Sequence, residues 1–494
     1  MRNPKSTAAG AAALALALTA GPVASSSGAS PSSASPSPGA AGAGDPLFPG
    51  LGNGGYDVTS YDLDLTYLAG TRTLRGKAGL AARATQALSR FNLDAAGLDV
   101  SNVNVNGVPA AFALRGEELV VTPEVALPRG LDFSVSVRYT ADPRPSATRP
   151  AGGLVATGEG FAIEPAPGAA HTVFPCNDHP SDKATLNVRI TAPAGLVGVA
   201  GGLSDGTTLN HDGTTSSMFR MRQPVATSRV ALAVGPYTML DRGLHGTVEW
   251  RDVVPTLQAP GMLPALSLTA DQVIWAQDRL GEFPLDAYGI LVAGGAPATG
   301  LAPQTLTVYR PDFLAQPEDR IGGQMMGGLV QSWFGSSVTP RDWSAQWLVG
   351  GHASLYSEMY RFDRGWADEH GHRTLDERMR ALYAQGDAWR ARSGAVARPS
   401  TTGLFDAQRR EGAGLALYAL LTKVGPEIFT KIERVFLAQY RDRSASTEDY
   451  IAVAEKAAAD PTVRPFLESW LYGKRTPAMP GNPGWKADRA PAAR

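Results

Sequence analysis

The sequence predicts an α+β protein of two domains, because the spacing of its apolar residues changes once along the chain. Over residues 56–240, apolar and polar residues alternate, as in residues 61–67, which is typical of half-buried strands. Beyond about residue 251 the spacing becomes helical, and the first apolar stripe ends at Gly281. We therefore expect a β-sandwich or saddle-like domain followed by a mixed α/β domain with C-terminal helices. The expected domains cover residues 46–250 and 251–480.

The two ends of the chain are predicted to lie outside these domains. Residues 1–24 have the pattern of a secretory signal peptide, with Arg2 and Lys5 before an Ala-rich apolar run that is short for an uncleaved anchor. Residues 25–45 are rich in Ser, Pro, Ala and Gly and are predicted to be a disordered linker, and residues 481–494 a disordered tail. We expect a secreted or extracytoplasmic protein without a membrane span after signal cleavage.

The charge balance and cysteine content exclude some classes of partner. The 494 residues include 45 basic and 46 acidic side chains, with a formal net charge of −1. This balance provides no broad positive field for nucleic acid. Cys176 is the only cysteine, so no internal disulfide can form, and we expect a buried, inert thiol. The oligomeric state is left open by the sequence.

Two segments resemble the M1 family of zinc aminopeptidases, the gluzincins. In residues 326–351 the pairs Trp333-Phe334 and Trp347-Leu348 have the spacing of the family's active-site core, and residues 174–185 resemble its Phe-Pro-Cys-x-Asp-x-Pro-x-x-Lys-Ala segment. The resemblance extends over residues 56–477. It implies that the second domain is thermolysin-like, with a cleft between the domains.

The same resemblance identifies positions where the metal ligands would stand. In the family, a helix carries two His at i and i+4 with a Glu between them, and the next helix carries a second Glu. The His positions fall on Gly327 and Gln331, the general base falls on Gly328, and the third ligand falls on Gly350. Glycine has no donor, and an amide oxygen is a poor zinc ligand. The sequence therefore predicts no cofactor, although the family uses zinc.

Two more positions differ from the family's pattern. Ala302 stands where the family has the Glu that binds the amino group of the substrate, and Arg409 stands where it has the Tyr that stabilises the oxyanion. The candidate residues for a peptide-binding cleft are Glu164, Gln304 and Gly300.

These departures predict a catalytically inactive pseudopeptidase that binds peptides or a protein partner in the former active-site cleft. One alternative is an active zinc aminopeptidase with a relocated metal site, whose candidate ligands are His352, Glu358, Glu369, His370 and His372. A second alternative is a structural cell-surface protein without a ligand.

Overall fold

The computed structural model describes residues 35–144, 152–294 and 301–488. The predicted signal peptide, most of the predicted linker, Gly300 and the end of the predicted tail lie outside these ranges. Residues Pro36–Arg494 belong to one compact unit. Among the described residues, no helix is both long enough and apolar enough to cross a membrane.

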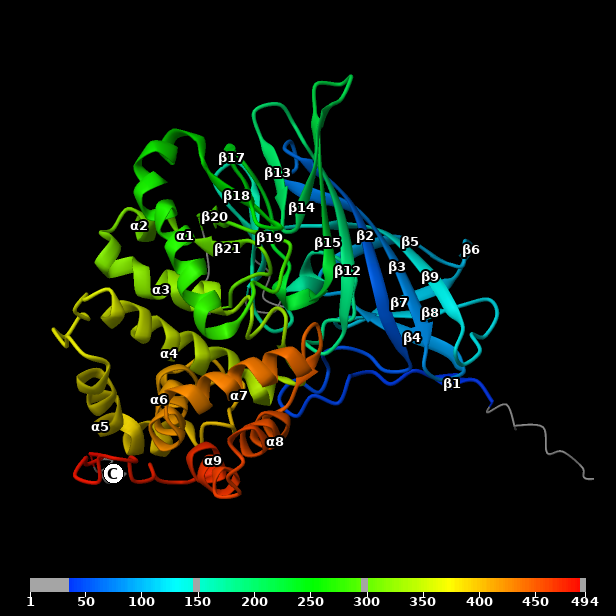
Figure 1. Cartoon of the computed structure of the whole chain (residues 1–494). Coiled ribbons are helices and arrows are strands. Elements are labelled where there is room, and N and C mark those ends of the chain that lie inside the picture. The colour runs from blue at the N-terminus through cyan, green and yellow to red at the C-terminus, as the bar shows by residue number, and fades with distance from the viewer. Residues whose placement is uncertain (1–34, 145–151, 295–300, 489–494) are drawn as a thin grey trace, which may run out of the picture. The chain divides into compact units, whose positions relative to one another are not determined.

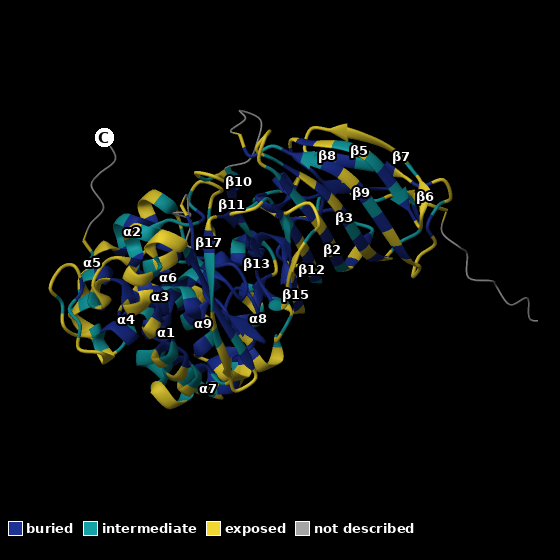
Figure 2. Ribbon diagram, turned by 90° about the horizontal axis from the view of Figure 1, so that it is seen from above, coloured by how far each residue is buried: buried dark blue, intermediate teal, exposed yellow. Residues whose placement is uncertain are grey.

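The N-terminal region is built from strands with one buried and one exposed face, as predicted (Figures 1 and 2). In the central strand, Tyr61, Leu63 and Leu65 are buried, whereas Asp62 and Asp64 are exposed. Burial on one face fixes the register of the pairing. The main sheet has the order β14 (Leu203–Leu209), β15 (Thr215–Ala226), β12 (Lys183–Ala192), β2 (Tyr56–Leu68), β3 (Thr73–Ala84), β9 (Asp132–Ala141), β5 (Leu98–Val105), β6 (Val108–Pro109).

Two smaller sheets complete the β domain. The first has the order β1 (Ser37–Pro38), β4 (Leu88–Asp94), β8 (Glu118–Thr122), β7 (Ala111–Arg115). The second has the order β10 (Gly153–Ala156), β11 (Phe161–Glu164), β16 (Leu232–Gly235), β13 (Val197–Ala200). Apolar side chains from both sheets share one core with the main sheet, so the sheets pack face to face.

The second region contains a mixed sheet and most of the helices. Its sheet has the order β17 (Tyr237–His245), β18 (Val248–Pro255), β20 (Ile290–Val292), β21 (Thr307–Tyr309), with β19 (Ala287–Tyr288) beside β18; β22 (Thr339–Pro340) pairs with β23 (Ser444–Ala445). The helices are α1 (Ala259–Leu280), α2 (Pro311–Leu314), α3 (Glu318–Val330), α4 (Trp347–Asp363), α5 (Leu375–Ser393), α6 (Ala407–Val424), α7 (Pro426–Gln439), α8 (Thr447–Ala458) and α9 (Val463–Tyr472). The two-domain α+β prediction is confirmed.

The helix ends follow local capping rules. Helix α1 ends before Gly281, whose φ of 90° is readily adopted only by glycine. Helix α8 is capped by Ser446: the Ser446 hydroxyl accepts a hydrogen bond from the Asp449 N–H, and the Asp449 carboxylate accepts one from the Ser446 N–H. The hydroxyl of the next residue, Thr447, accepts a hydrogen bond from Trp347 Nε1 at 2.8 Å.

The described end of the expected linker is ordered against the rest of the chain. Strand β1 pairs in parallel with β4. Asp45 is 2% exposed and accepts hydrogen bonds from the backbone N–H groups of Leu47, Phe48 and Trp343 at 2.7, 2.8 and 2.8 Å. We call residues 37–48 the N-terminal strap. The predicted disorder is thus corrected here, because partners distant in sequence supply contacts that local composition does not reveal.

The described start of the expected C-terminal tail also makes contacts. Trp485 packs edge-on against Tyr383, with ring centroids 5.6 Å apart. The Asp488 N–H donates to the Ala384 carbonyl at 2.8 Å. This segment therefore lies on α5.

We expect Asp45→Ala to lower the free energy of unfolding by about 2–4 kcal/mol, because it leaves the buried N–H of Trp343 and the part-buried N–H groups of Leu47 and Phe48 without an acceptor. Burial raises the pKa of Asp45, but its hydrogen bonds with His179, Trp343, Phe48 and Leu47 outweigh burial and hold the pKa below its ordinary value. The stabilisation is therefore present at neutral pH and is lost as pH falls through that lowered pKa. Urea unfolding at pH 7 and at lower pH measures both effects.

Asp132→Ala is the matched control, since its side chain is 77% exposed and lies 3.5 Å from Arg83, which is 60% exposed. It should change stability by less than about 0.5 kcal/mol. Equal effects of the two substitutions would contradict a structural role for Asp45.

Candidate functional site

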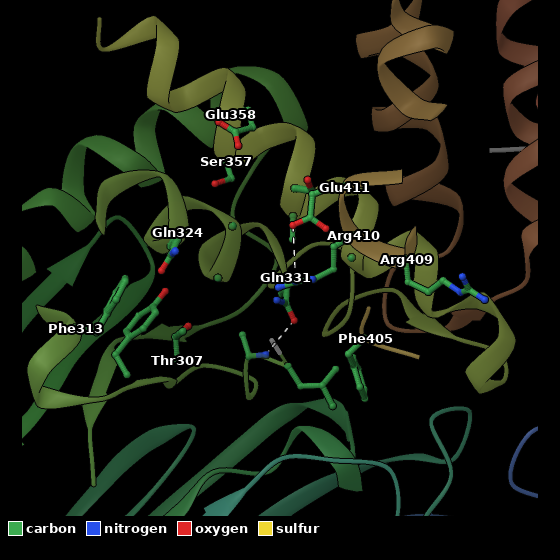
Figure 3. Close-up of a pocket in the computed structure, with 18 of the residues that line it drawn as sticks. Thr307, Phe313, Gln324, Gln331, Ser357, Glu358, Phe405, Arg409, Arg410 and Glu411 are labelled. Carbon is green, nitrogen blue, oxygen red and sulfur yellow. Dashed lines mark hydrogen bonds and ion pairs between the residues drawn. The ribbon is translucent and has the colours of Figure 1, made fainter. Parts of the chain in front are cut away.

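A cavity of about 460 Å³ lies beside α3, α4, the start of α6 and the edge strand β21 (Figure 3). It brings together the positions that the sequence singled out. The predicted site residues that line it are Ala302, Gly327, Gly328, Gln331, Gly350 and Arg409. The cavity therefore occupies the place where the predicted metal positions meet.

The glycines at the predicted metal positions allow α3 and α4 to pack closely. A Cβ atom on Gly327 would lie 3.1 Å from the Ala353 carbonyl oxygen on α4. A Cβ atom on Gly328 would collide with the Tyr309 hydroxyl and lie 3.1 Å from Thr307 Cγ2. Larger side chains at these two positions require the neighbouring elements to move.

Gly350 has the same role between α4 and α6. A Cβ atom at this position would lie 2.5 Å from the Arg409 carbonyl oxygen and 3.4 Å from Arg410 Cγ. On the next residue, Gly351, a Cβ atom would lie 2.8 Å from Ala413 Cβ. A carboxylate side chain at position 350 would therefore displace the start of α6.

The remaining metal position, Gln331, is held by an arginine from the β domain. Its Oε1 accepts hydrogen bonds from Arg229 Nη1 at 2.7 Å and from the Ala302 N–H at 2.9 Å. Arg229 is 2% exposed, and burial lowers its pKa to about 9. Gly335 leaves room for this guanidinium, since a Cβ atom there would lie 2.7 Å from Arg229 Nη2. Gly327 and Gly350 have no side-chain ligand atom, and Gln331 has only a neutral amide, so these three positions do not fit a zinc ion.

The acidic side chains at the other end of the cavity are paired with arginines. Glu358 lies 3.2 Å from Arg361 Nε and 3.2 Å from Arg378 Nε. Glu369 lies 3.4 Å from Arg378 Nη2. Burial raises the pKa of Glu358, and the two arginines oppose this shift. These two carboxylates are therefore already engaged in ion pairs within the protein.

Arg409 contributes to the cavity wall, but its side chain points away from the cavity (Figure 3). Its Nη2 donates to the carbonyls of Ser393 and Arg398 at 2.6 and 2.9 Å. The neighbouring Arg410, which the sequence interpretation missed, extends into the cavity instead (Figure 3). No sequence signal distinguished the two, because neighbouring residues on a helix differ by about 100° in direction.

The three residues suggested for a peptide cleft are not brought together. Gln304 is 1% exposed and its amide donates to the Gln223 carbonyl at 3.2 Å, outside the cavity lining. Glu164 lies in β11 of the β domain, where burial raises its pKa. Gly300 lies outside the described residues.

The candidate ligands of a relocated metal site do not form one metal-binding group: Glu369 and His370 are neighbours, 3.6 Å apart, whereas His352 has separate partners. His352 is buried between α4 and α7, with Nε2 2.9 Å from Glu433 Oε2 and Nδ1 2.5 Å from the Leu348 carbonyl. His372 Nδ1 lies 2.7 Å from Asp368 Oδ2. Over the described ranges, no three or more His, Cys, Asp or Glu side chains are arranged to hold a metal ion.

Sequence comparison connects this architecture to known proteins. Residues 58–228 match the Peptidase M1 N-terminal domain family. The chain is 24% identical to leukotriene A-4 hydrolase of Xenopus laevis over 443 residues, which covers 83% of this chain and 70% of that protein. It is also 24% identical to glutamyl aminopeptidase of Rattus norvegicus, covering 63% of this chain but only 34% of that protein.

Solved structures agree with the sequence matches. An M1 zinc metallopeptidase variant from Deinococcus radiodurans with a Tyr-Ser-Ala substrate has a TM-score of 0.75 and 27% identity, covering 90% of this chain and 100% of that chain. This chain is an M1 peptidase homologue. A two-domain M1 zinc metallopeptidase variant bound to L-arginine gives a TM-score of 0.75 and 28% identity, covering 89% of this chain and 99% of that chain.

These matches correct the prediction that this M1 homologue has no cofactor. That prediction is wrong as a statement about the protein, since its structural neighbours are zinc metallopeptidases. What the residues support is narrower. Gly327, Gln331 and Gly350 do not provide the imidazole and carboxylate donors that a zinc site of this kind uses.

We expect Gly350→Ala to lower the free energy of unfolding by about 1–3 kcal/mol, because the added methyl group overlaps the Arg409 carbonyl. Gly261→Ala in α1 is the matched control, since a Cβ atom there meets nothing within 4 Å. The control should leave stability unchanged or raise it by up to about 1 kcal/mol. Chemical denaturation compares the two, and a neutral Gly350→Ala would contradict the close approach of α4 and α6.

Proposed function

We propose that this M1 homologue is exported and binds peptides in the cavity without hydrolysing them. The observation that carries the proposal is the close packing at Gly327, Gly328 and Gly350, together with the engagement of Gln331 by Arg229. Hydrolysis in this kind of site needs an activated water and a general base at those positions. Here backbone, the Tyr309 hydroxyl and a neutral amide occupy them.

Peptide binding is supported by the edge of the mixed sheet. Strand β21 is the last strand in its sheet, and Thr307, Val308 and Tyr309 line the cavity. The Thr307 N–H and the Tyr309 carbonyl are hydrogen-bonded on the β20 side. Since backbone groups alternate in direction along a strand, Val308 turns its N–H and C=O outward. An extended peptide that pairs with this edge gains main-chain hydrogen bonds.

The cavity also has the size and apolar wall that a peptide side chain requires. Its volume of about 460 Å³ is in the usual range for ligand pockets. Phe313 stacks on Tyr309 with ring centroids 5.0 Å apart, and Leu404 and Phe405 form part of another wall. In the Deinococcus radiodurans protein, which has the same fold, a Tyr-Ser-Ala peptide is bound.

Export is supported by the N-terminal sequence. Basic residues precede an Ala-rich apolar run and a small-residue cleavage region. These residues precede the N-terminal strap, so cleavage near residue 24 would leave the strap attached to the mature protein.

We expect the mature protein to bind short peptides with apolar side chains and to leave them intact. Calorimetry measures binding, and mass spectrometry of the peptide after long incubation measures cleavage, each with and without added zinc. Phe313→Ala should weaken binding by about 1–2 kcal/mol, because it removes part of the apolar wall. Phe112→Ala is the matched control, since Phe112 is 38% exposed on β7 of the β domain.

Cleavage that is abolished by a chelator and restored by zinc would overturn the non-hydrolytic proposal. Absence of any peptide binding would overturn the binding role.

A further inference from the structure

We propose that the cavity recognises peptides by a carboxylate group, and not by the amino terminus. This inference rests on the proposed peptide-binding function and names the chemistry of its ligand. Three features of the cavity wall near Gln331, Ala302 and Arg410 support it.

The first observation is the position of Arg410. Its side chain is 48% exposed and reaches into the cavity from the first turn of α6, across the space that Gly350 leaves open (Figure 3). Its ion partner is Glu411, whose Oε1 lies 3.6 Å from Nη2, beyond ordinary hydrogen-bond distance. The guanidinium can therefore donate to a ligand in the planar, paired geometry that suits a carboxylate.

The second observation is a buried positive charge behind the cavity floor. Arg229 donates to the Ala302 carbonyl at 2.9 Å as well as to Gln331, and both acceptors are neutral. Among the described residues, Arg229 has no carboxylate within ion-pair distance. Because little water surrounds it, its field extends to the cavity side of Gln331 and Ala302. A ligand anion there gains from both guanidinium groups.

The third observation concerns the carboxylates that would favour an amino group. Glu358 and Glu369 already pair with Arg361 and Arg378. Glu411 Oε1 faces Arg410 Nη2 at 3.6 Å, and Glu411 Oε2 is buried away from solvent, so neither oxygen is presented openly to a ligand amino group. Ala302 has no side-chain acceptor for an ammonium group. The cavity centre is thus biased towards a carboxylate.

The test uses the peptide Ala-Leu-Phe with its two ends free or blocked, and calorimetry on the mature protein. Amidation of the C-terminus should weaken binding about ten- to hundredfold, which is the loss of one charge-assisted hydrogen bond, whereas acetylation of the N-terminus should have little effect. Arg410→Gln should abolish the preference for the free acid. Arg392→Gln on α5 removes an exposed charge outside the cavity and should preserve it.

A fourth probe separates the two sources of a peptide carboxylate. Acetyl-Ala-Glu-Phe-amide has only a side-chain carboxylate, so tight binding that depends on Arg410 would support recognition of an acidic side chain. If acetylation weakens binding and amidation does not, the carboxylate proposal is overturned and peptide binding stands. If none of the probes binds, both proposals are overturned. Thermal unfolding of each variant establishes that it is folded.

Discussion

The close approach of α4 to α3 and α6 is the constraint on which the rest of the second domain depends. Gly327, Gly350 and Gly351 place backbone against backbone, so the helices meet at distances that side chains would prevent. The bulky residues around them, among them Trp333, Phe334 and Trp347, remain fully buried in the same core. This packing frame is therefore formed although positions 327, 331 and 350 carry no imidazole or carboxylate.

The same packing changes the electrostatics beneath the cavity. Lys183 Nζ donates to the carbonyls of Ser336 and Ser337, both at 2.8 Å, and burial with the nearby charge of Arg229 lowers its pKa to about 7 despite Asp442. Arg229 lies behind Gln331. Two basic side chains from the β domain thus contact the segment that contains and follows the end of α3, and they link the two domains through neutral acceptors. Arg229, whose pKa is about 9, carries the positive charge there at neutral pH.

Much of the fold could be predicted from the sequence, because its signals are local. The period of two in β2 and the helical stripe before Gly281 both depend on residues close in the chain. The N-terminal strap could not be predicted, since Asp45 is fixed by the Trp343 N–H, which is 298 residues away. Its composition, rich in Gly and Ala, is typical of a segment with little structure of its own.

The location of the candidate site could be predicted, but not which side chains enter the cavity. Spacing relative to Trp333 and Trp347 located Gly327, Gln331 and Gly350, and these positions do meet at one cavity. Spacing along one helix could not show that Arg410, and not Arg409, reaches into it.

The sign of the ligand charge that we propose for the cavity depends on Ala302, Arg229 and Arg410. A position that loses a carboxylate, as Ala302 does relative to the M1 pattern, also loses its attraction for an amino group. Buried Arg229 and half-exposed Arg410 lie near the same part of the cavity, so the proposed ligand charge there is negative. The proposed lack of hydrolysis and the proposed ligand preference therefore rest on one arrangement, in which glycines and a neutral amide stand at positions 327, 331 and 350 and two arginines lie close by.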